Sequence, residues 1–314
     1  MLVALATYAL AASLRADAPP TEFLELGDGR IAYDVAGEGP LVVMLPGLGD
    51  LRQEYRFLAP LLAQAGYRVA TVDVRGHGES SVGWPRYDSV AVGQDLLALV
   101  DHLGGPAFVV GNSFSAGAAV WAAAERPSAI AGLALLGPFV REQDTSAVMT
   151  LALKVLLGGP WKVRAWTAYH GTLFKSGKPA DYADYSAALR RNLAEPGRFE
   201  AVRALMFRSD EAVESRLSRV GAPVVVVMGG SDPDFPDPER EAREVAEALH
   251  GRYVMLPGVG HYPQAEAPKA TLEAILPTLG EAFGGTTDAA GAGGGPGRGG
   301  TSTGGTADGA ARGG

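Results

Sequence analysis

The chain has 314 residues, enough for one large domain, and 47% of them are hydrophobic, enough for a sizeable buried core. A net charge of −8 and the lack of any Lys/Arg-dense stretch argue against nucleic acid or anionic lipid as a partner, so a small molecule is expected. There is no cysteine, which excludes disulfides, thiolate catalysis and cysteine metal sites.

The first 21 residues are predicted to form an extension outside the folded domain. Residues 1–14 form an apolar run about as long as the core of a signal peptide, but no Lys or Arg precedes the run and Arg15 follows it. The pattern favours a short helix or loose extension ending at Pro19-Pro20 over a secretion signal, and hence a cytoplasmic protein. No run reaches the roughly 18 apolar residues of a membrane-spanning helix, so we expect a soluble protein.

From residue 22 onward, short apolar segments alternate with amphipathic ones. The runs 22–26 and 30–35 flank Gly27-Asp28-Gly29, a turn signal typical of a β-hairpin. Further strands are predicted at 41–45, 68–73, 107–111, 130–136, 223–228 and 252–256, and helices at 52–65, 88–103, 114–126, 238–249 and in a last segment ending near 283. Strands that are apolar on both faces and separated by helices predict a mostly parallel sheet with helices on both sides.

Two segments depart from this alternation of strands and helices. Residues 141–220 contain helical runs such as SAVMTLALKVLL and FEAVRALMF but no clear strand, which predicts a helical insertion. Open α/β sheets bind ligands at the carboxyl ends of their strands, so we expect the insertion to cover that edge as a lid. Residues 284–314 are so rich in glycine that a disordered tail is predicted, which leaves 22–283 as the folded domain.

The strongest chemical signal is Gly111-Asn112-Ser113-Phe114-Ser115, between a predicted strand and a predicted helix. A serine can be presented at such a sharp turn only if small residues stand two positions before and after it, as Gly111 and Ser115 do. The helix start would also supply an N–H and a dipole for a developing negative charge. A shifted motif with Ser115 as nucleophile is an alternative, as is a serine-rich helix cap without catalysis, but Gly111 ends the strand and favours Ser113.

This motif resembles the nucleophile elbow of the α/β-hydrolase superfamily, usually G-x-S-x-G, with Ser115 in place of the last glycine. Gly260-His261-Tyr262-Pro263 follows the last predicted strand and resembles the loop that carries the superfamily's catalytic histidine. Imidazole titrates near neutrality and suits the base that Ser113 needs. The resemblance implies an α/β-hydrolase fold with a helical lid, and the family's chain order of serine, acid and histidine.

A carboxylate is needed beside His261 to fix its tautomer and stabilise its positive charge. The segment 229–236 follows a predicted strand and is similar to the family's acid loop. Asp232 fits the family pattern because Pro236 stands four residues after it, and Asp234 is the rival. Both aspartates could also do no more than form turns beside their prolines.

A tetrahedral oxyanion needs two donors, and both are predicted to be backbone N–H groups. One is that of Phe114, the residue after the nucleophile. The other is that of Leu48, because Leu45-Pro46-Gly47-Leu48-Gly49-Asp50 resembles the family's oxyanion loop with Pro46 in the place of a histidine. A bare turn is the alternative, and the loop lacks the G-K-[ST] of a phosphate-binding loop.

The stretch 73–80 also resembles one that is common in the superfamily. Its Arg75 and His77 are predicted to be structural, with glycines that permit the turn and polar side chains that bond to it. No histidine pair has metal-ligand spacing, so neither a metal nor a cofactor is predicted. The isolated histidines are His102, His170 and His250.

The resemblance covers about residues 22–283 and implies a two-step acyl transfer through an acyl-enzyme, with a carboxylic ester as the leading substrate. A serine at the elbow argues against epoxide hydrolase or haloalkane dehalogenase chemistry, for which the family uses a carboxylate. Two alternatives stay open. Gly111-Asn112-Ser113-Phe114 resembles the elbow of carbon–carbon bond hydrolases, although the Pro46 loop departs from theirs, and the fold could also serve a ligand receptor with little turnover.

Aromatic residues of the predicted lid suggest an apolar roof over a pocket, although aromatics at helical spacing can equally be core residues. They are Trp161, Trp166, Tyr169, Phe174, Tyr182 and Tyr185.

Overall fold

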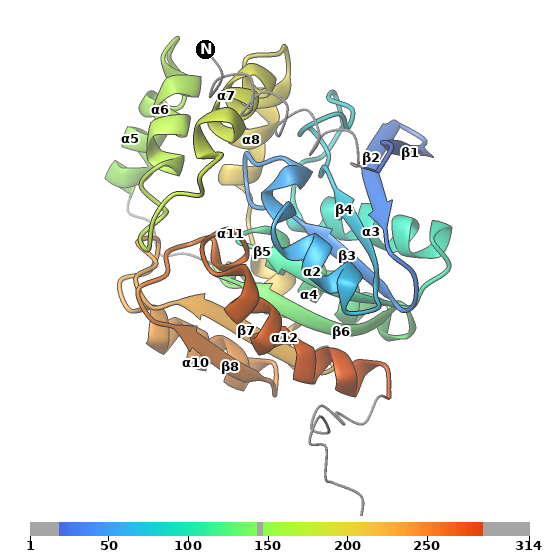
Figure 1. Cartoon of the computed structure of the whole chain (residues 1–314). Coiled ribbons are helices and arrows are strands. Elements are labelled where there is room, and N and C mark those ends of the chain that lie inside the picture. The colour runs from blue at the N-terminus through green and yellow to red at the C-terminus, as the bar shows by residue number, and fades with distance from the viewer. Residues whose placement is uncertain (1–18, 143–146, 285–314) are drawn as a thin grey trace, which may run out of the picture.

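The computed structural model describes residues 19–142 and 147–284. Most of the predicted amino-terminal extension and all but the first residue of the predicted tail lie outside these described residues. One sheet of eight strands runs through the molecule in the order β1-β2-β4-β3-β5-β6-β7-β8 (Figure 1). The strands are β1 (Glu22–Leu26), β2 (Gly29–Ala36), β3 (Leu41–Leu45), β4 (Arg68–Val72), β5 (Ala107–Asn112), β6 (Ile130–Leu136), β7 (Val224–Gly229) and β8 (Arg252–Leu256).

The sheet is mostly parallel, as predicted. β1 pairs antiparallel with β2, and β2 pairs antiparallel with β4, which makes the predicted hairpin the edge of the sheet. All other neighbouring strands are parallel. The mostly parallel sheet of the predicted fold class is therefore confirmed.

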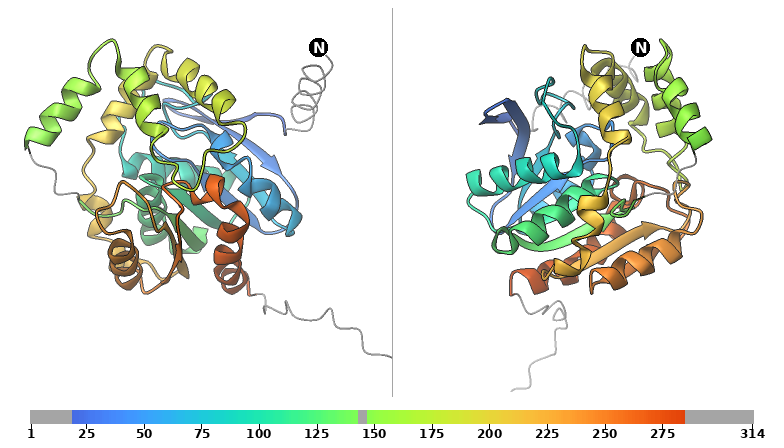
Figure 2. Two further views of the ribbon diagram at one scale, coloured as in Figure 1. Left: turned by 60° about the vertical axis from the view of Figure 1, so that its left-hand side comes forward. Right: turned by 180° about the vertical axis from the view of Figure 1, so that it is seen from behind.

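Two hydrophobic cores lie on the two faces of the sheet. In β5, Ala107 and Val109 point into one core, while Phe108 and Val110 point into the other. Helices α3 (Ser89–His102), α4 (Ser115–Glu125) and α10 (Pro238–Ala248) pack on the first face, and α2 (Leu58–Gln64) and α12 (Pro268–Ala282) on the second (Figure 2). Because both faces are covered, the central strands are apolar at nearly every position.

The segment 52–65 differs from its prediction as a single helix. It forms a 3-10 turn, η1 (Arg52–Tyr55), followed by α2. The Arg52 N–H donates to Asp73 Oδ1 at 2.8 Å, and the Arg52 side chain is buried against the same carboxylate. These tertiary bonds hold the start of the segment in a conformation that local helix propensity does not favour.

Between β6 and β7 the structure has the helices α5 (Ala147–Leu156), α6 (Lys162–His170), α7 (Tyr182–Leu193), α8 (Arg198–Met206) and α9 (Glu211–Glu214). We call α5 to α9 the helical insertion. It has a small hydrophobic core of its own, built around Trp166, Leu189 and Phe199. Leu51, from the loop after β3, joins this core, so the helical insertion packs on that loop.

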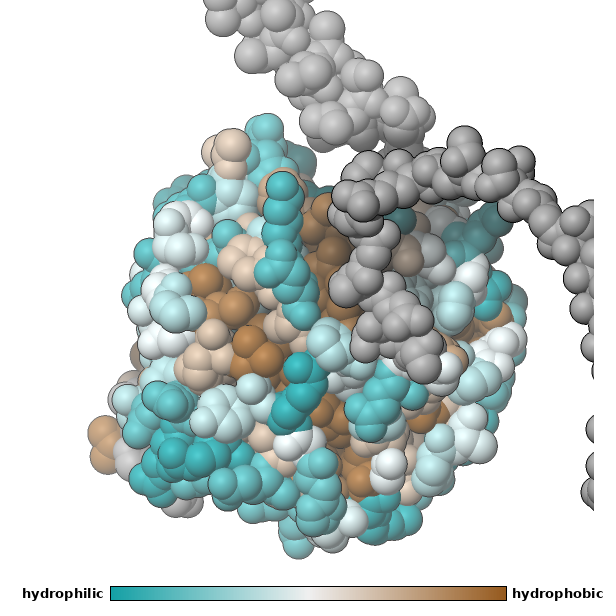
Figure 3. Space-filling view, turned by 60° about the horizontal axis from the view of Figure 1, so that its bottom comes forward, coloured by the Kyte–Doolittle hydropathy of each residue, from teal (hydrophilic) through white to brown (hydrophobic). Residues whose placement is uncertain are grey.

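No helix in the described ranges is both long and apolar enough to cross a bilayer. On the face drawn in Figure 3, apolar residues lie in patches with hydrophilic residues around them. Such a mixed surface is ordinary for a globular protein.

Candidate active site

The turn after β5 holds Ser113 in an unusual backbone conformation. Its φ is 57°, in the left-handed region that side chains other than glycine rarely adopt. The turn is fixed from both sides, because the Ser113 N–H donates to Leu136 O at 2.9 Å and Ser113 O accepts from the Phe139 N–H at 3.2 Å. A Cβ at Gly111 would lie 2.8 Å from Ser115 O, so the tight turn requires glycine there. Ser113 keeps 9% of its surface exposed, which leaves the residue reachable.

Ser115, the alternative nucleophile, has a different environment. Its side chain is fully buried, and its hydroxyl donates to Pro46 O at 2.6 Å. The hydroxyl thus joins the elbow to the loop after β3. This bond gives a structural reason for serine in place of the last glycine of the elbow, and it favours Ser113 as the reactive residue.

The loops after β7 and β8 bring an imidazole and a carboxylate together. His261 Nδ1 lies 2.7 Å from Asp232 Oδ2, and both side chains are buried. Gly137, after β6, packs against this pair with a φ of 52°, and a Cβ there would lie 3.1 Å from both His261 Nδ1 and Asp232 Oδ2. The Asn112 amide donates to His261 O at 3.2 Å and so ties the histidine loop to the residue before Ser113.

Asp234 lies on the other side of the same ring. Its Oδ2 is 3.7 Å from His261 Nε2, and its Oδ1 accepts from the Tyr169 hydroxyl at 2.5 Å. The Ser113 hydroxyl has no hydrogen-bond partner within residues 19–142 and 147–284. The structure therefore contains the Asp232–His261 pair, with Nε2 facing Asp234 instead of bonding Ser113.

The two aspartates control the titration of this imidazole. Burial by itself would lower the pKa of His261, but the negative charges of Asp232 and Asp234 outweigh burial and raise the pKa to about 9. The protonated ring is thus stabilised in this arrangement, as a base that must carry a positive charge during a reaction requires.

The loop after β3 is held at nearly every residue. The Gly47 N–H donates to Glu54 Oε2 at 2.8 Å, and the Gly49 N–H donates to His77 Nε2 at 3.0 Å. The carbonyl of Pro46 accepts from Ser115, as described above. Leu48 stands in the middle of these tethers, and its N–H finds no acceptor among the described residues, nor does that of Phe114. Unpaired N–H groups near a buried turn are what an oxyanion would require.

His77 acts as a link between two loops. Nε2 accepts from Gly49, Nδ1 lies 3.1 Å from Arg75 O, and burial lowers the pKa of the ring to about 4. Arg75 makes a bidentate ion pair with Asp95, with both bonds at 2.7 Å. These contacts agree with the structural roles predicted for His77 and Arg75.

Two buried acids, Asp50 in the loop after β3 and Glu54 in η1, were not singled out by the sequence analysis. Asp50 accepts from the hydroxyls of Tyr185 at 2.9 Å and Tyr262 at 2.7 Å, and His170 Nε2 lies 3.0 Å from it. Burial opposes ionisation of Asp50, but His170 and these hydrogen bonds lower its pKa. In Glu54, burial and the nearby Asp50 charge raise the pKa well above its usual value. Nothing in the sequence marks Asp50 and Glu54 except that they are the acidic residues of a short segment whose other residues are uncharged or basic.

The aromatic residues predicted to roof a pocket have different surroundings. Trp166 and Tyr185 are buried in the helical insertion, whereas Trp161 and Tyr169 are 50% and 42% exposed. The rings of Phe174 and Tyr182 pack on Tyr262 and His170, respectively.

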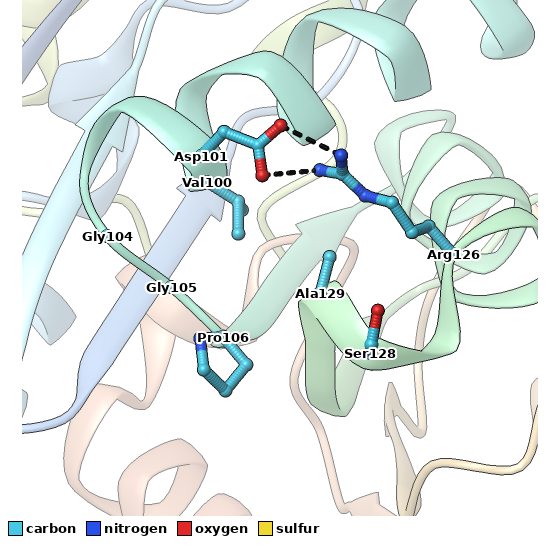
Figure 4. A pocket seen from close by; sticks show the side chains of 8 residues that line it. All are labelled: Val100, Asp101, Gly104, Gly105, Pro106, Arg126, Ser128 and Ala129. Carbon is cyan, nitrogen blue, oxygen red and sulfur yellow. Dashed lines mark hydrogen bonds and ion pairs between the residues drawn. The ribbon is translucent and has the colours of Figure 1, made fainter.

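A cavity of about 220 Å³ lies near the amino ends of the strands, at the end of the sheet away from Ser113 (Figure 4). Its wall includes Gly105, Pro106 and Ser128, which precede the amino ends of β5 and β6, and the ion pair between Arg126 and Asp101. Ser113 follows the carboxyl end of β5, so this cavity lies away from the candidate site and contributes no group to it.

Within residues 19–142 and 147–284, the candidate site contains a group of side chains that could hold a metal ion. Asp232, Asp234 and His261 each offer one ligand atom, and these atoms lie within 4.8 Å of one another. A cation there would compete for the nitrogens of His261. That no metal is used stays a prediction.

This chain is similar to a known protein family and to several known proteins. The family model described as "alpha/beta hydrolase fold" matches residues 40–268. A relative from Pseudomonas putida, the dihydrolipoyllysine-residue acetyltransferase component of an acetoin cleaving system, is 28% identical over 84% of this chain and 70% of its own length. Epoxide hydrolase B of Mycobacterium tuberculosis is 32% identical, but over only 48% of this chain and 40% of its own.

Solved structures show the same fold at low identity. A putative lipase from Acinetobacter baumannii superposes with a TM-score of 0.73 at 18% identity, covering 88% of this chain and 96% of its own. A bromoperoxidase from Bacillus anthracis gives a TM-score of 0.73 at 20% identity, covering 83% and 99%.

Proposed function

Since the chain belongs to the α/β-hydrolase fold family, we propose that it is a serine hydrolase that cleaves a carboxylic ester, or a related acyl bond, of a small apolar substrate. Ser113 is the nucleophile, His261 its base and Asp232 the acid that orients the base. The N–H groups of Leu48 and Phe114 stabilise the oxyanion. A cytoplasmic location is part of the proposal and rests on the amino-terminal sequence.

The proposed reaction has two halves. Ser113 Oγ attacks the acyl carbon while His261 Nε2 takes its proton, and the imidazolium then protonates the departing alcohol. Water, activated by the same Nε2, attacks the acyl-enzyme, and Ser113 regains its proton as the acid leaves. In both halves the charge on the carbonyl oxygen develops where two unpaired N–H groups are available.

The observation that carries the proposal is the left-handed φ of 57° at Ser113, on a turn joined through Asn112 to the loop of the Asp232–His261 pair. A backbone strained at a reachable serine needs a reason, and presenting a hydroxyl supplies one. Serine at this position also argues against the activity named for the epoxide hydrolase relatives, because an epoxide-opening member of the family uses a carboxylate there.

The Asn112 side chain bears on the carbon–carbon bond hydrolase alternative. Its amide donates to Leu136 O at 3.0 Å as well as to His261 O. The asparagine therefore has a positioning role that ester hydrolysis uses equally. The resemblance of the elbow to carbon–carbon bond hydrolases does not by itself require that chemistry.

Hydrolysis of p-nitrophenyl butyrate tests the proposal. Ser113→Ala should lower kcat by about a thousandfold or more, because the acyl-enzyme can no longer form. Ser128→Ala is the matched control, since this serine is exposed at the end of the sheet away from Ser113. Equal rates for the wild type and Ser113→Ala would reject the serine hydrolase and favour a binding protein on the same fold.

A further inference from the structure

Asp234 lies where the alcohol of an ester has to be protonated. In the proposed reaction, the proton on His261 Nε2 passes to the oxygen of the leaving alcohol. Asp234 Oδ2 lies 3.7 Å from this nitrogen. The carboxylate therefore borders the part of the site that the leaving group must occupy.

In the part of the chain that the structure describes, Asp234 has no Lys or Arg partner, and it shares the His261 ring with Asp232, so two carboxylates face a single imidazole. Within the described ranges no Lys or Arg nitrogen lies within 4.0 Å of it, and its neighbours are His261 and the Tyr169 hydroxyl. Its side chain is 15% exposed, against 2% for His261, so the carboxylate faces the outer part of the site. A ligand that reaches His261 from outside passes a carboxylate whose one basic neighbour among the described residues, His261, is shared with Asp232.

Aromatic rings stand beside this carboxylate. Tyr169, which donates to it, has 42% of its surface exposed, and its ring centre lies 5.8 Å from that of Trp166. On the next residue of the loop, the Phe235 ring lies 6.4 Å from the His261 ring and stacks on Phe139 at 4.8 Å. The Tyr169 ring is exposed next to this carboxylate, so an ammonium group bound there can interact with both the negative charge and the ring.

We propose that the alcohol part of the substrate carries a positively charged amine, which Asp234 and Tyr169 recognise. This inference rests on the proposed ester hydrolysis and replaces the apolar alcohol part of that substrate with a cationic one. The ester C–O bond breaks as Ser113 is acylated, His261 gives its proton to the alkoxide oxygen, and an amino alcohol leaves with its positive charge unchanged. Water then releases the carboxylic acid.

A cation at Asp234 would also change the base. The charged groups that face His261 are Asp232, Asp234 and Glu54, and all three favour the protonated imidazole. A bound ammonium offsets the charge of Asp234, so the imidazole in the complex gives up its proton at a lower pH. The cationic substrate thus helps to free the base that its own cleavage requires.

A pair of esters of nearly equal shape tests the inference. Butyrylcholine carries a quaternary ammonium, and 3,3-dimethylbutyl butyrate is its neutral counterpart. The wild type should have a kcat/KM about tenfold higher for the cationic ester, and Asp234→Asn should bring the ratio close to one. Glu239→Gln, which removes an exposed negative charge from the first turn of α10, should leave the ratio unchanged.

Two further measurements use only the wild type, so they do not require a variant to fold. Choline should inhibit p-nitrophenyl butyrate hydrolysis at about tenfold lower concentration than 3,3-dimethylbutan-1-ol. The pH profile of kcat should rise at a lower pH with butyrylcholine than with the neutral ester. A purely structural role for Asp234 would produce neither difference.

The outcomes separate this inference from the proposed function. If the two esters and the two alcohols behave alike while p-nitrophenyl butyrate hydrolysis depends on Ser113, the cationic substrate is wrong and the serine hydrolase stands. If Asp234→Asn folds and keeps the wild-type ratio, Asp234 is not the recognition group. If no ester hydrolysis depends on Ser113, both proposals fail together.

Discussion

The α/β body and the helical insertion are held in place by different forces. In the body, parallel strands share backbone hydrogen bonds, and two large cores cover the sheet. The helical insertion has a much smaller core and is tied to the body by side chains, such as Tyr185 on Asp50 and the bidentate pair of Arg56 with Asp181. The body therefore fixes the distances within the candidate site, whereas the helical insertion is positioned mainly by side-chain contacts with the body.

The two aspartates of the β7 loop divide between these regions. Asp232 is buried in the body against His261 Nδ1, and Asp234 is bonded to Tyr169 of the helical insertion. One carboxylate thus bonds the imidazole from inside the fold. The other meets Nε2 from the side on which the helical insertion lies.

The largest expected effect comes from replacing Asp232, the aspartate that is buried in the body. Asp232→Asn should lower kcat for p-nitrophenyl butyrate by about 10³ to 10⁴, because the imidazole loses its orientation and the support for its positive charge. The matched Asp234→Asn should lose far less on this neutral ester. Steady-state kinetics decides, and a larger loss for Asp234→Asn would make Asp234 the triad acid.

The next effect tests how firmly the loops of the body are locked. The pKa of His77 is about 4 in the fold, below the usual 6.5, so folding favours the neutral ring. The stabilisation is complete above about pH 6.5 and is lost as the pH falls toward 4. The loss amounts to about 3 kcal/mol, since one pKa unit corresponds to about 1.4 kcal/mol.

Urea unfolding at several pH values measures this loss, with His77→Gln as the comparison because glutamine does not titrate. The free energy of unfolding should fall more steeply toward acid in the wild type than in the variant. Parallel pH curves would show that His77 does not lock the loops through its neutral form.

The smallest effect concerns the link between the helical insertion and the oxyanion loop. Tyr185→Phe removes a hydrogen bond to buried Asp50 and should cost about 1 to 2 kcal/mol of stability. Because Asp50 stands two residues after Leu48, kcat should fall as well. Tyr253→Phe, at an exposed tyrosine of β8, is the control. A loss of stability with unchanged kcat would show that the loop keeps its geometry without the helical insertion.

The predicted strands agree with the observed ones to within one or two residues at each end. Their apolar runs are bounded by glycine, proline and charged residues, and the central strands are buried on both faces, so few polar residues interrupt the pattern. The helical insertion was less predictable. Polar and aromatic residues are mixed in α6 and α7, because part of each helix faces the loops below and part faces solvent.

The candidate site divides in the same way. Motifs in the sequence single out Ser113, His261 and two aspartates, because turns and loops at strand ends have local signatures. They do not single out Asp50 or Glu54, whose partners on α7, α11 (Pro263–Glu266) and the loop between β8 and α11 lie far away in the chain.

The sequence by itself determined the order of strands and helices, the strained turn at Ser113 and the loops that meet it. Only the tertiary structure decided which aspartate bonds Nδ1, that Nε2 faces Asp234, and that Ser115 joins the elbow to the loop after β3. The physical reason is that local propensity and hydrophobic period act over a few neighbouring residues. The choice of hydrogen-bond partner depends instead on how separate loops converge once the sheet has formed.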